Sequence, residues 1–228
     1  MNTTEYSKLL QSIRSQFIGM AKHDPSYMDC VKALNLAESR IHTGMRKDGK
    51  TKEFYHQLSI VGFLITQHRN LANPRAVYIA AILHDTPEDY PEFSAMIREM
   101  FPNDFVYAQR LSKIDNDGNK IPYATYFGEM GRCPVCSVVK LVDRIHNTST
   151  MPGVFSPEKM RKYIDEIVQY FLPMAKAARR AFPEQDAFYE LAKSVMSMKV
   201  ASYTYFLDEI DRVNGKKPKH EQDTSPRI

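Results

Sequence analysis

Apolar residues recur at the three- and four-residue spacing of a helix along almost the whole chain. Alternating runs bounded by turn residues, the pattern of strands, are nearly absent. The pattern therefore predicts an all-α protein, a helical bundle. The expected helices cover roughly 4–22, 26–43, a segment from 53 onward, 74–85, 91–101, 104–114, a segment from 134 onward, 157–181 and 183–213.

Prolines and a capping residue define several of these boundaries. Asn73 is expected to cap a helix whose first residue is Pro74, and Pro87 turns the chain soon after that helix ends. Pro134 opens a later helix, and Pro173 is expected to kink the helix over 157–181.

Length and composition indicate one domain. With 228 residues, 43% hydrophobic and 25% charged, the chain can bury one substantial core. We expect a single domain over 1–213, with its core over about 26–182 and flanking helices at both ends. The polar segment 214–228 predicts a disordered tail.

Several classes of protein are disfavoured. No apolar run is long enough to span a bilayer, and the first residues lack the apolar region of a secretory signal. Three cysteines, an odd number, do not suggest a disulfide framework, so a cytoplasmic protein is expected. A net charge of +4 is compatible with a phosphorylated small molecule but too weak to indicate nucleic-acid binding. The oligomeric state stays open.

Four side chains of metal-binding type stand out: His56, the adjacent pair His84 and Asp85, and Asp143. Neighbouring side chains on a helix diverge by about 100°, so the adjacent pair can reach one ion only at a helix end. Pro87 puts them there. A carboxylate next to the apolar run 76–83 is costly to bury unless a cation or donors compensate it.

Each position also has a structural explanation. A single histidine on an apolar helix is commonly a hydrogen-bonded core residue, and His56 could cap a helix. Asp143 could pair on the surface with Lys140 and Arg144.

Taken together, two nitrogen and two oxygen ligands leave open positions on an octahedral ion, which favours manganese or iron over a closed zinc site. Such an ion activates water and neutralises charge on phosphorus. Glu88 and Asp89, one turn beyond the paired ligands, are candidates for the general base, although a charge pair at a helix start is an equal alternative.

Two longer strings carry a family resemblance. AAILHDTPED is similar to ALLHDTVED, and VKLVDRIHNTST to IKLADRLHNMRT, of the HD hydrolase domain in the RelA/SpoT enzymes. HTGMRKDG and EIVQYFLPMAKAAR resemble two further segments of that family. The similarity spans roughly 37–179 and is strongest to its stand-alone small hydrolases.

The resemblance implies an HD-type, manganese-dependent hydrolase that removes the 3′-pyrophosphate of guanosine tetra- or pentaphosphate. Metal ligation then falls to His56, His84, Asp85 and Asp143, and water activation to Glu88 and Asp89. The positions that match nucleotide contacts or other motif residues of the family are Arg46, Lys47, Lys140, Arg144, Asn147 and Thr150.

Departures from the family pattern touch substrate contacts rather than ligands. Gln57 replaces a proline, Ser149 replaces an arginine, and the segment 111–114 matches only in part. Two other hypotheses therefore stay open: an HD hydrolase acting on a nucleoside monophosphate, dNTP, cyclic nucleotide or NADPH, and a non-catalytic nucleotide-binding relative.

Two other motifs favour structural roles. Cys133 and Cys136 have the spacing of a zinc or redox pair, but no second pair exists and Pro134 between them marks a helix start. The string DNDGNK lacks the terminal glutamate of a calcium loop and predicts a turn.

Overall fold

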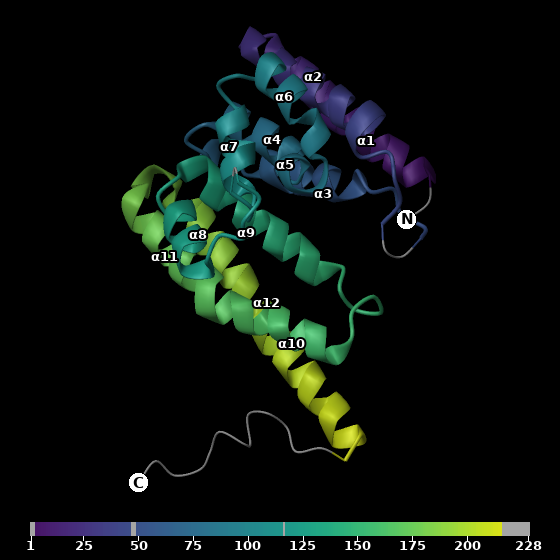
Figure 1. Ribbon diagram of the computed structural model, residues 1–228, viewed down its shortest axis with the longest axis vertical. Helices are drawn as coiled ribbons and strands as arrows, with labels where there is room; N and C mark the ends of the chain where they lie inside the picture. Colours follow the sequence, from purple (N-terminus) through teal and green to yellow (C-terminus); the bar gives the residue numbers. More distant parts are fainter. Residues whose placement is uncertain (1–2, 47–48, 116, 216–228) are drawn as a thin grey trace.

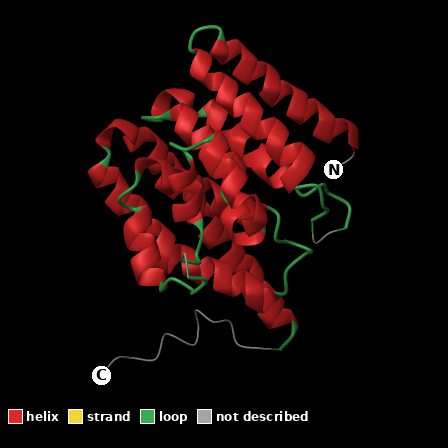
Figure 2. Ribbon diagram, turned by 45° about the horizontal axis from the view of Figure 1, so that its top comes forward, coloured by secondary structure: helices red, strands yellow, loops and turns green. Residues whose placement is uncertain are grey.

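The computed structural model describes residues 3–46, 49–115 and 117–215 (Figure 1). Every regular element in these ranges is helical, which confirms the predicted all-α fold, and none of the described residues forms a strand (Figure 2). Two isolated antiparallel bridges, Met45 with Lys52 and Ile114 with Lys120, close loops between helices. Lys47 and the tail beyond residue 215 lie outside the described residues.

The α-helices follow one another along the chain with short connections. They are α1 (Thr3–Ala21), α2 (Met28–Leu36), α3 (Tyr55–Thr66), α4 (Pro74–Leu83), α5 (Thr86–Asp89), α6 (Ser94–Met100), α7 (Phe105–Leu111), α8 (Tyr123–Met130), α9 (Pro134–Ser149), α10 (Pro157–Glu166), α11 (Leu172–Ala181) and α12 (Asp186–Val213).

Two predicted long helices contain a π-helical turn. The helix expected over 26–43 is α2 followed by the π turn Ala37–Ile41, and the one over 157–181 is α10, the π turn Ile167–Phe171 and α11. The second π turn directly precedes Pro173, which lies in the first turn of α11. The interruption therefore falls where the proline predicted a kink.

Two short helices were missed. Pro87 does not simply turn the chain, because it lies in the first turn of α5, where its missing N–H costs no hydrogen bond. Helix α8 is only eight residues long, and its buried side chains Tyr126, Phe127 and Met130 attach it to the core. Tertiary packing of this kind leaves little local signal in a short segment.

Local sequence accounts for the two helices that matter most for the site. Asn73 caps α4 as predicted, since its side chain accepts a hydrogen bond from the N–H of Ala76, and Pro74 is the first helical residue. Cys133 caps α9, its sulfur accepting the N–H of Cys136 at 3.4 Å, so this pair does mark a helix start. All three cysteines are free thiols.

Helix α4 forms the middle of the core. All of its residues from Ala76 to Leu83 are buried, and it packs against α2, α3, α7 and α9. Figure 1 shows α1 to α7 gathered in one half, with α8 and α10 to α12 in the other, and α9 running between them. This arrangement brings the start of α3, the end of α4 and the middle of α9 together. Within the described ranges, no helix is both long and apolar enough to cross a membrane.

Candidate metal centre

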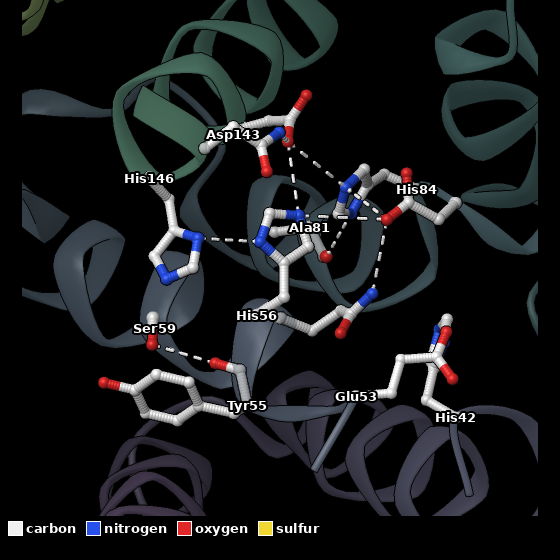
Figure 3. A network of polar contacts seen from close by, with 12 residues as sticks. His42, Glu53, Tyr55, His56, Ser59, Ala81, His84, Asp143 and His146 are labelled. Carbon is white, nitrogen blue, oxygen red and sulfur yellow. Dashed lines mark hydrogen bonds and ion pairs between the residues drawn. The ribbon is translucent and has the colours of Figure 1, made fainter. Parts of the chain in front are cut away.

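Three helices deliver the four proposed ligands to one point. His56 lies in the first turn of α3, His84 ends α4, Asp85 precedes α5, and Asp143 lies on α9. The side chains of His56, His84 and Asp143 are buried and offer donor atoms within 4.8 Å of one another, a group that could hold a metal ion. Figure 3 shows these three converging.

The distances between donor atoms show that Asp85 also lies beside this group. Nε2 of His84 lies 3.0 Å from Oδ2 of Asp85 and 3.9 Å from Oδ1 of Asp143. Nε2 of His56 lies 3.8 Å and 3.2 Å from the same two oxygens. Each histidine therefore turns its Nε2 atom toward both carboxylates, as one shared cation would require.

The hydrogen bonding of His84 fits a metal ligand. Its Nδ1 lies 2.8 Å from the carbonyl oxygen of Ala81, whereas its Nε2 is buried and has no hydrogen-bond partner of acceptable geometry. Ligating histidines commonly donate the other ring N–H to a carbonyl or carboxylate, which leaves one lone pair for the metal. A buried nitrogen without such a partner is otherwise costly.

Electrostatics indicate that this group of residues needs a positive charge. Desolvation alone would raise the pKa of Asp85 and of Asp143. The neighbouring His84 nevertheless holds the pKa of Asp85 well below its usual range. Lys140 and His56 do the same for Asp143. Burial opposes the charge on His84, yet Asp85 and Asp143 outweigh it and raise its pKa to about 9. Without a metal, a proton on His84 thus supplies part of the charge that a divalent cation would provide.

The group opens into a cavity of about 490 Å³, a size typical of small-ligand sites. The lining is charged and partly aromatic. It includes the carboxylates of Glu53, Asp85, Glu88 and Asp89, the cations of Arg46, Lys113 and Lys140, and the rings of Tyr55, Phe155 and Tyr163.

Several of the predicted substrate residues lie in this cavity. Arg46, Lys140, Asn147 and Thr150 all line it. Lys140 places its ammonium 3.4 Å from Oδ2 of Asp143, and Asn147 donates to Oδ1 of that carboxylate at 2.5 Å. Two of these residues therefore contact a proposed ligand directly.

Arg144 lies elsewhere. Its guanidinium is buried, 2.6 Å from Oε2 of Glu166, and is packed over the rings of Tyr163 and Phe171. It is not among the residues lining the cavity. Ser149, which replaces a family arginine, also lies off the cavity, and its hydroxyl accepts a hydrogen bond from the Lys199 ammonium at 2.7 Å.

The carboxylates of Glu88 and Asp89 lie on the cavity lining, where they are partly accessible to solvent. Oε2 of Glu88 accepts the backbone N–H of Lys113 at 3.0 Å. Partial burial, and then the charges of Asp85 and Glu88, raise the pKa of Asp89 to about 6. A pKa of this value suits Asp89 to exchanging a proton near neutral pH.

One polar cluster beside the cavity was missed. The hydroxyl of Tyr90 donates to both oxygens of Glu53, at 2.8 and 2.7 Å, and Nδ1 of His42 lies 3.3 Å from the same carboxylate. The backbone N–H of Glu53 bonds to the carbonyl of Gly44. These contacts join the loop carrying Arg46 to the segment carrying Glu88 and Asp89. The string HTGMRKDG, which begins just after Ile41, was the only sequence signal.

Three further polar residues near the ligands were not predicted from the sequence as part of the site. Gln57 is buried and donates from Nε2 to Oδ2 of Asp85 at 3.4 Å. Lys113, in the segment that only partly matches the family pattern, lines the cavity. His146 places its Nδ1 only 2.8 Å from Nδ1 of His56. Burial, and then the charges of His56 and Arg46, lower the pKa of His146 to about 3, so this ring is neutral.

Comparison with known proteins gives a distant similarity. No protein-family model matches the chain. Over 143 residues it is 28% identical to a probable guanosine-3′,5′-bis(diphosphate) 3′-pyrophosphohydrolase of Synechocystis sp. (strain ATCC 27184 / PCC 6803 / Kazusa). The match covers 59% of this chain but only 18% of the Synechocystis protein, so the chain spans less than a fifth of that relative. The all-helical fold and the buried His-His-Asp group are consistent with an HD domain.

Proposed function

We propose that this protein is an HD-type, metal-dependent phosphohydrolase. The observation that carries the proposal is the convergence of two histidine Nε2 atoms and two carboxylates at the base of a charged cavity. The distant similarity to a pyrophosphohydrolase supports the same chemistry. We assign 1–213 to one hydrolase domain.

His56, His84, Asp85 and Asp143 would hold one divalent ion, for which we propose Mn²⁺ because the set mixes imidazole with carboxylate. When bound, the ion supplies Lewis acidity, neutralising charge on a phosphoryl oxygen and lowering the pKa of water. Gln57 and Asn147 each hold one carboxylate of this set by a hydrogen bond. Hydrogen bonds of this kind orient ligating carboxylates.

Proton transfer is assigned to the carboxylate pair. Asp89 accepts a proton from the attacking water, and its partial burial, together with the charges of Asp85 and Glu88, keeps its carboxylate basic. The nearby Tyr90–Glu53 contact fixes the end of α5, from which both carboxylates extend. General base and metal site are therefore held by the same short stretch of chain.

The substrate we propose is guanosine tetra- or pentaphosphate, hydrolysed to GDP or GTP and pyrophosphate. Arg46, Lys113 and Lys140 give the cavity the cations that a pyrophosphate needs, while Asn147 and Thr150 offer groups for a sugar. The tyrosine and phenylalanine rings of the lining provide surfaces for a base. We also assign a base contact to Lys47, by resemblance alone.

A second candidate is hydrolysis of another nucleotide. It is favoured by Ser149, which replaces a family arginine and lies off the cavity, hydrogen-bonded to Lys199. One phosphate contact of the family is thereby lost, which suits a substrate with fewer phosphates.

A product assay tests both candidates. The protein is incubated with Mn²⁺ and, separately, guanosine tetraphosphate, NADPH, a dNTP, a cyclic nucleotide and a nucleoside monophosphate. Release of pyrophosphate together with GDP supports the first candidate. Hydrolysis of another nucleotide supports the second, whether it appears as free phosphate, pyrophosphate or triphosphate or as the monophosphate formed when a cyclic nucleotide opens. A protein that binds Mn²⁺ but hydrolyses none of them contradicts the proposed function.

A further inference from the structure

The two proposed histidine ligands differ in the group that their Nδ1 atoms contact. His84 places its Nδ1 against a backbone carbonyl within its own helix, that of Ala81. His56 places its Nδ1 against the side chain of a residue 90 positions away, Nδ1 of His146, at 2.8 Å (Figure 3). In both rings the remaining nitrogen, Nε2, points to Asp85 and Asp143.

Two imidazole nitrogens 2.8 Å apart make a hydrogen bond only when one carries a proton and the other a lone pair. If His56 uses Nε2 to bind a metal, that atom must present its lone pair, so the proton of the neutral ring must lie on Nδ1. Nδ1 of His146 must then be the acceptor. The metal-binding tautomer of His56 is therefore the one that this contact stabilises.

The position of His146 suits this task. It lies on α9, one turn after Asp143, so the helix that contributes a carboxylate ligand also orients an imidazole ligand on α3. The ring of Tyr55 meets His146 edge to face with centroids 6.2 Å apart, and the His56 and His146 rings are 4.7 Å apart. These contacts restrict the rotation that would break the hydrogen bond.

We propose that His146 is a positioning residue of the metal centre, whose Nδ1 accepts the Nδ1 proton of His56 and holds His56 Nε2 toward the ion. The inference rests on the metal centre of the proposed function and is independent of the substrate. His146 does not touch the ion, and its effect passes entirely through His56.

The test measures Mn²⁺ affinity of the full chain after removal of metal with a chelator. His146→Leu removes the acceptor, whereas His146→Asn keeps an oxygen close to the position of Nδ1. The matched control is His68→Leu, because His68 is also half-buried and bonds through Nδ1, to the hydroxyl of Tyr78.

We expect His146→Leu to weaken Mn²⁺ binding roughly 10- to 100-fold, with His146→Asn recovering most of the affinity and the control unchanged. Thermal unfolding of the metal-free variants shows whether a weaker affinity for Mn²⁺ merely reflects a less stable fold. Equal affinity in wild type and His146→Leu, or an equal loss in the Leu and Asn variants, overturns the inference.

Nitrogen-15 NMR of wild-type protein loaded with Zn²⁺ provides a second readout that needs no variant. We expect the proton of His56 on Nδ1, and a proton on Nε2 overturns the inference. A wild type that binds metal in this way without hydrolysing any nucleotide contradicts only the proposed function. A wild type that binds no metal overturns both.

Discussion

At the scale of single residues, His84 carries the strongest local evidence for a cation. It is 2% exposed, at the end of an apolar helix where an unsatisfied nitrogen is costly. Asp85 and Asp143 stabilise positive charge there, which accounts for the raised pKa of the imidazole. A metal ion satisfies the nitrogen and both carboxylates at once.

Removing one ligand should therefore weaken metal binding strongly without unfolding the protein. We predict that His84→Ala and Asp85→Asn each lower Mn²⁺ affinity by about a hundredfold or more. This exceeds the loss typical of residues that only hydrogen-bond to a ligand. Metal-dependent phosphate release should fall with it. Calorimetric titration measures the affinity, and circular dichroism checks that the chain stays helical. Full activity in either variant would rule out the ligand assignment.

The carboxylates of Glu88 and Asp89 give a prediction about pH. A base acts in its deprotonated form, so we expect kcat to rise with pH as Asp89 ionises and then to level off. The midpoint should lie below the metal-free pKa of about 6, because a bound cation offsets the Asp85 charge that helps raise it. The double substitution Glu88→Gln and Asp89→Asn should lower kcat by about 10²- to 10⁴-fold while Mn²⁺ still binds. An unchanged kcat would remove both residues from the mechanism.

The same double variant should be more stable than wild type when metal-free. The folded-state pKa of Asp89 is raised above its ordinary value of 3.8, so ionising it disfavours the folded state. This cost is absent below about pH 4 and complete above about pH 6. Melting temperatures at about pH 4 and about pH 8 should therefore show a gain only at the higher pH.

At the scale of elements, α9 joins the site to the second half of the molecule through Arg144. This buried cation is paired with Glu166 at the end of α10 and packed over two aromatic rings. One guanidinium nitrogen, Nη1, is buried without a hydrogen-bond partner. The charge therefore depends on Glu166.

We predict that Glu166→Ala destabilises the protein by about 3–5 kcal/mol, because it leaves a buried charge unpaired. The matched control is Glu209→Ala, which breaks an exposed pair with Arg212 and should cost about 1 kcal/mol or less. Denaturant unfolding measures both. Equal losses would show that the buried pair contributes no more than the surface one.

Local sequence was sufficient for the elements whose boundaries depend on nearby residues. The structure confirms the cap at Asn73 and the helix start at Pro134. Both could be predicted because each depends on residues at most three positions apart. For the same reason, the sequence could place His84 and Asp85 at a helix end. It could not predict α8, whose stability comes from aromatic contacts with Tyr170 and Phe171 far along the chain.

Contacts across the chain also decided which motif residues reach the cavity. Lys140 and Arg144 are one helical turn apart on α9, yet Lys140 lines the cavity whereas Arg144 pairs with Glu166 of α10. The contact between His56 and His146 and the bond from Tyr90 to Glu53 likewise join distant segments. Spacing along one helix could not indicate either pair.

At the scale of the whole molecule, one ion would tie the first half of the molecule to α9, the helix that runs between the halves. Its ligands come from α3, the α4–α5 junction and α9, and they meet at the base of the cavity. A cation that binds the folded chain alone shifts the folding equilibrium by mass action. Metal binding should therefore appear in the global stability.

We predict that Mn²⁺ at about a hundred times its dissociation constant stabilises the protein by about 2.7 kcal/mol and raises Tm by roughly 5–10 °C. A chelator should reverse the shift, and Mg²⁺, which prefers oxygen ligands, should give a smaller one. Calorimetry with His84→Ala as the control measures this. An equal shift in that variant would place the binding elsewhere.

The most direct test of the central claim couples bound metal to turnover. Protein stripped of metal is titrated with Mn²⁺ in the presence of guanosine tetraphosphate, and pyrophosphate release is measured alongside metal content. Our account predicts no release from the stripped protein and a rate that rises in proportion to bound metal, saturating at one ion per chain. Pyrophosphate release without metal, or one bound ion with no hydrolysis of this or any other nucleotide, would contradict it.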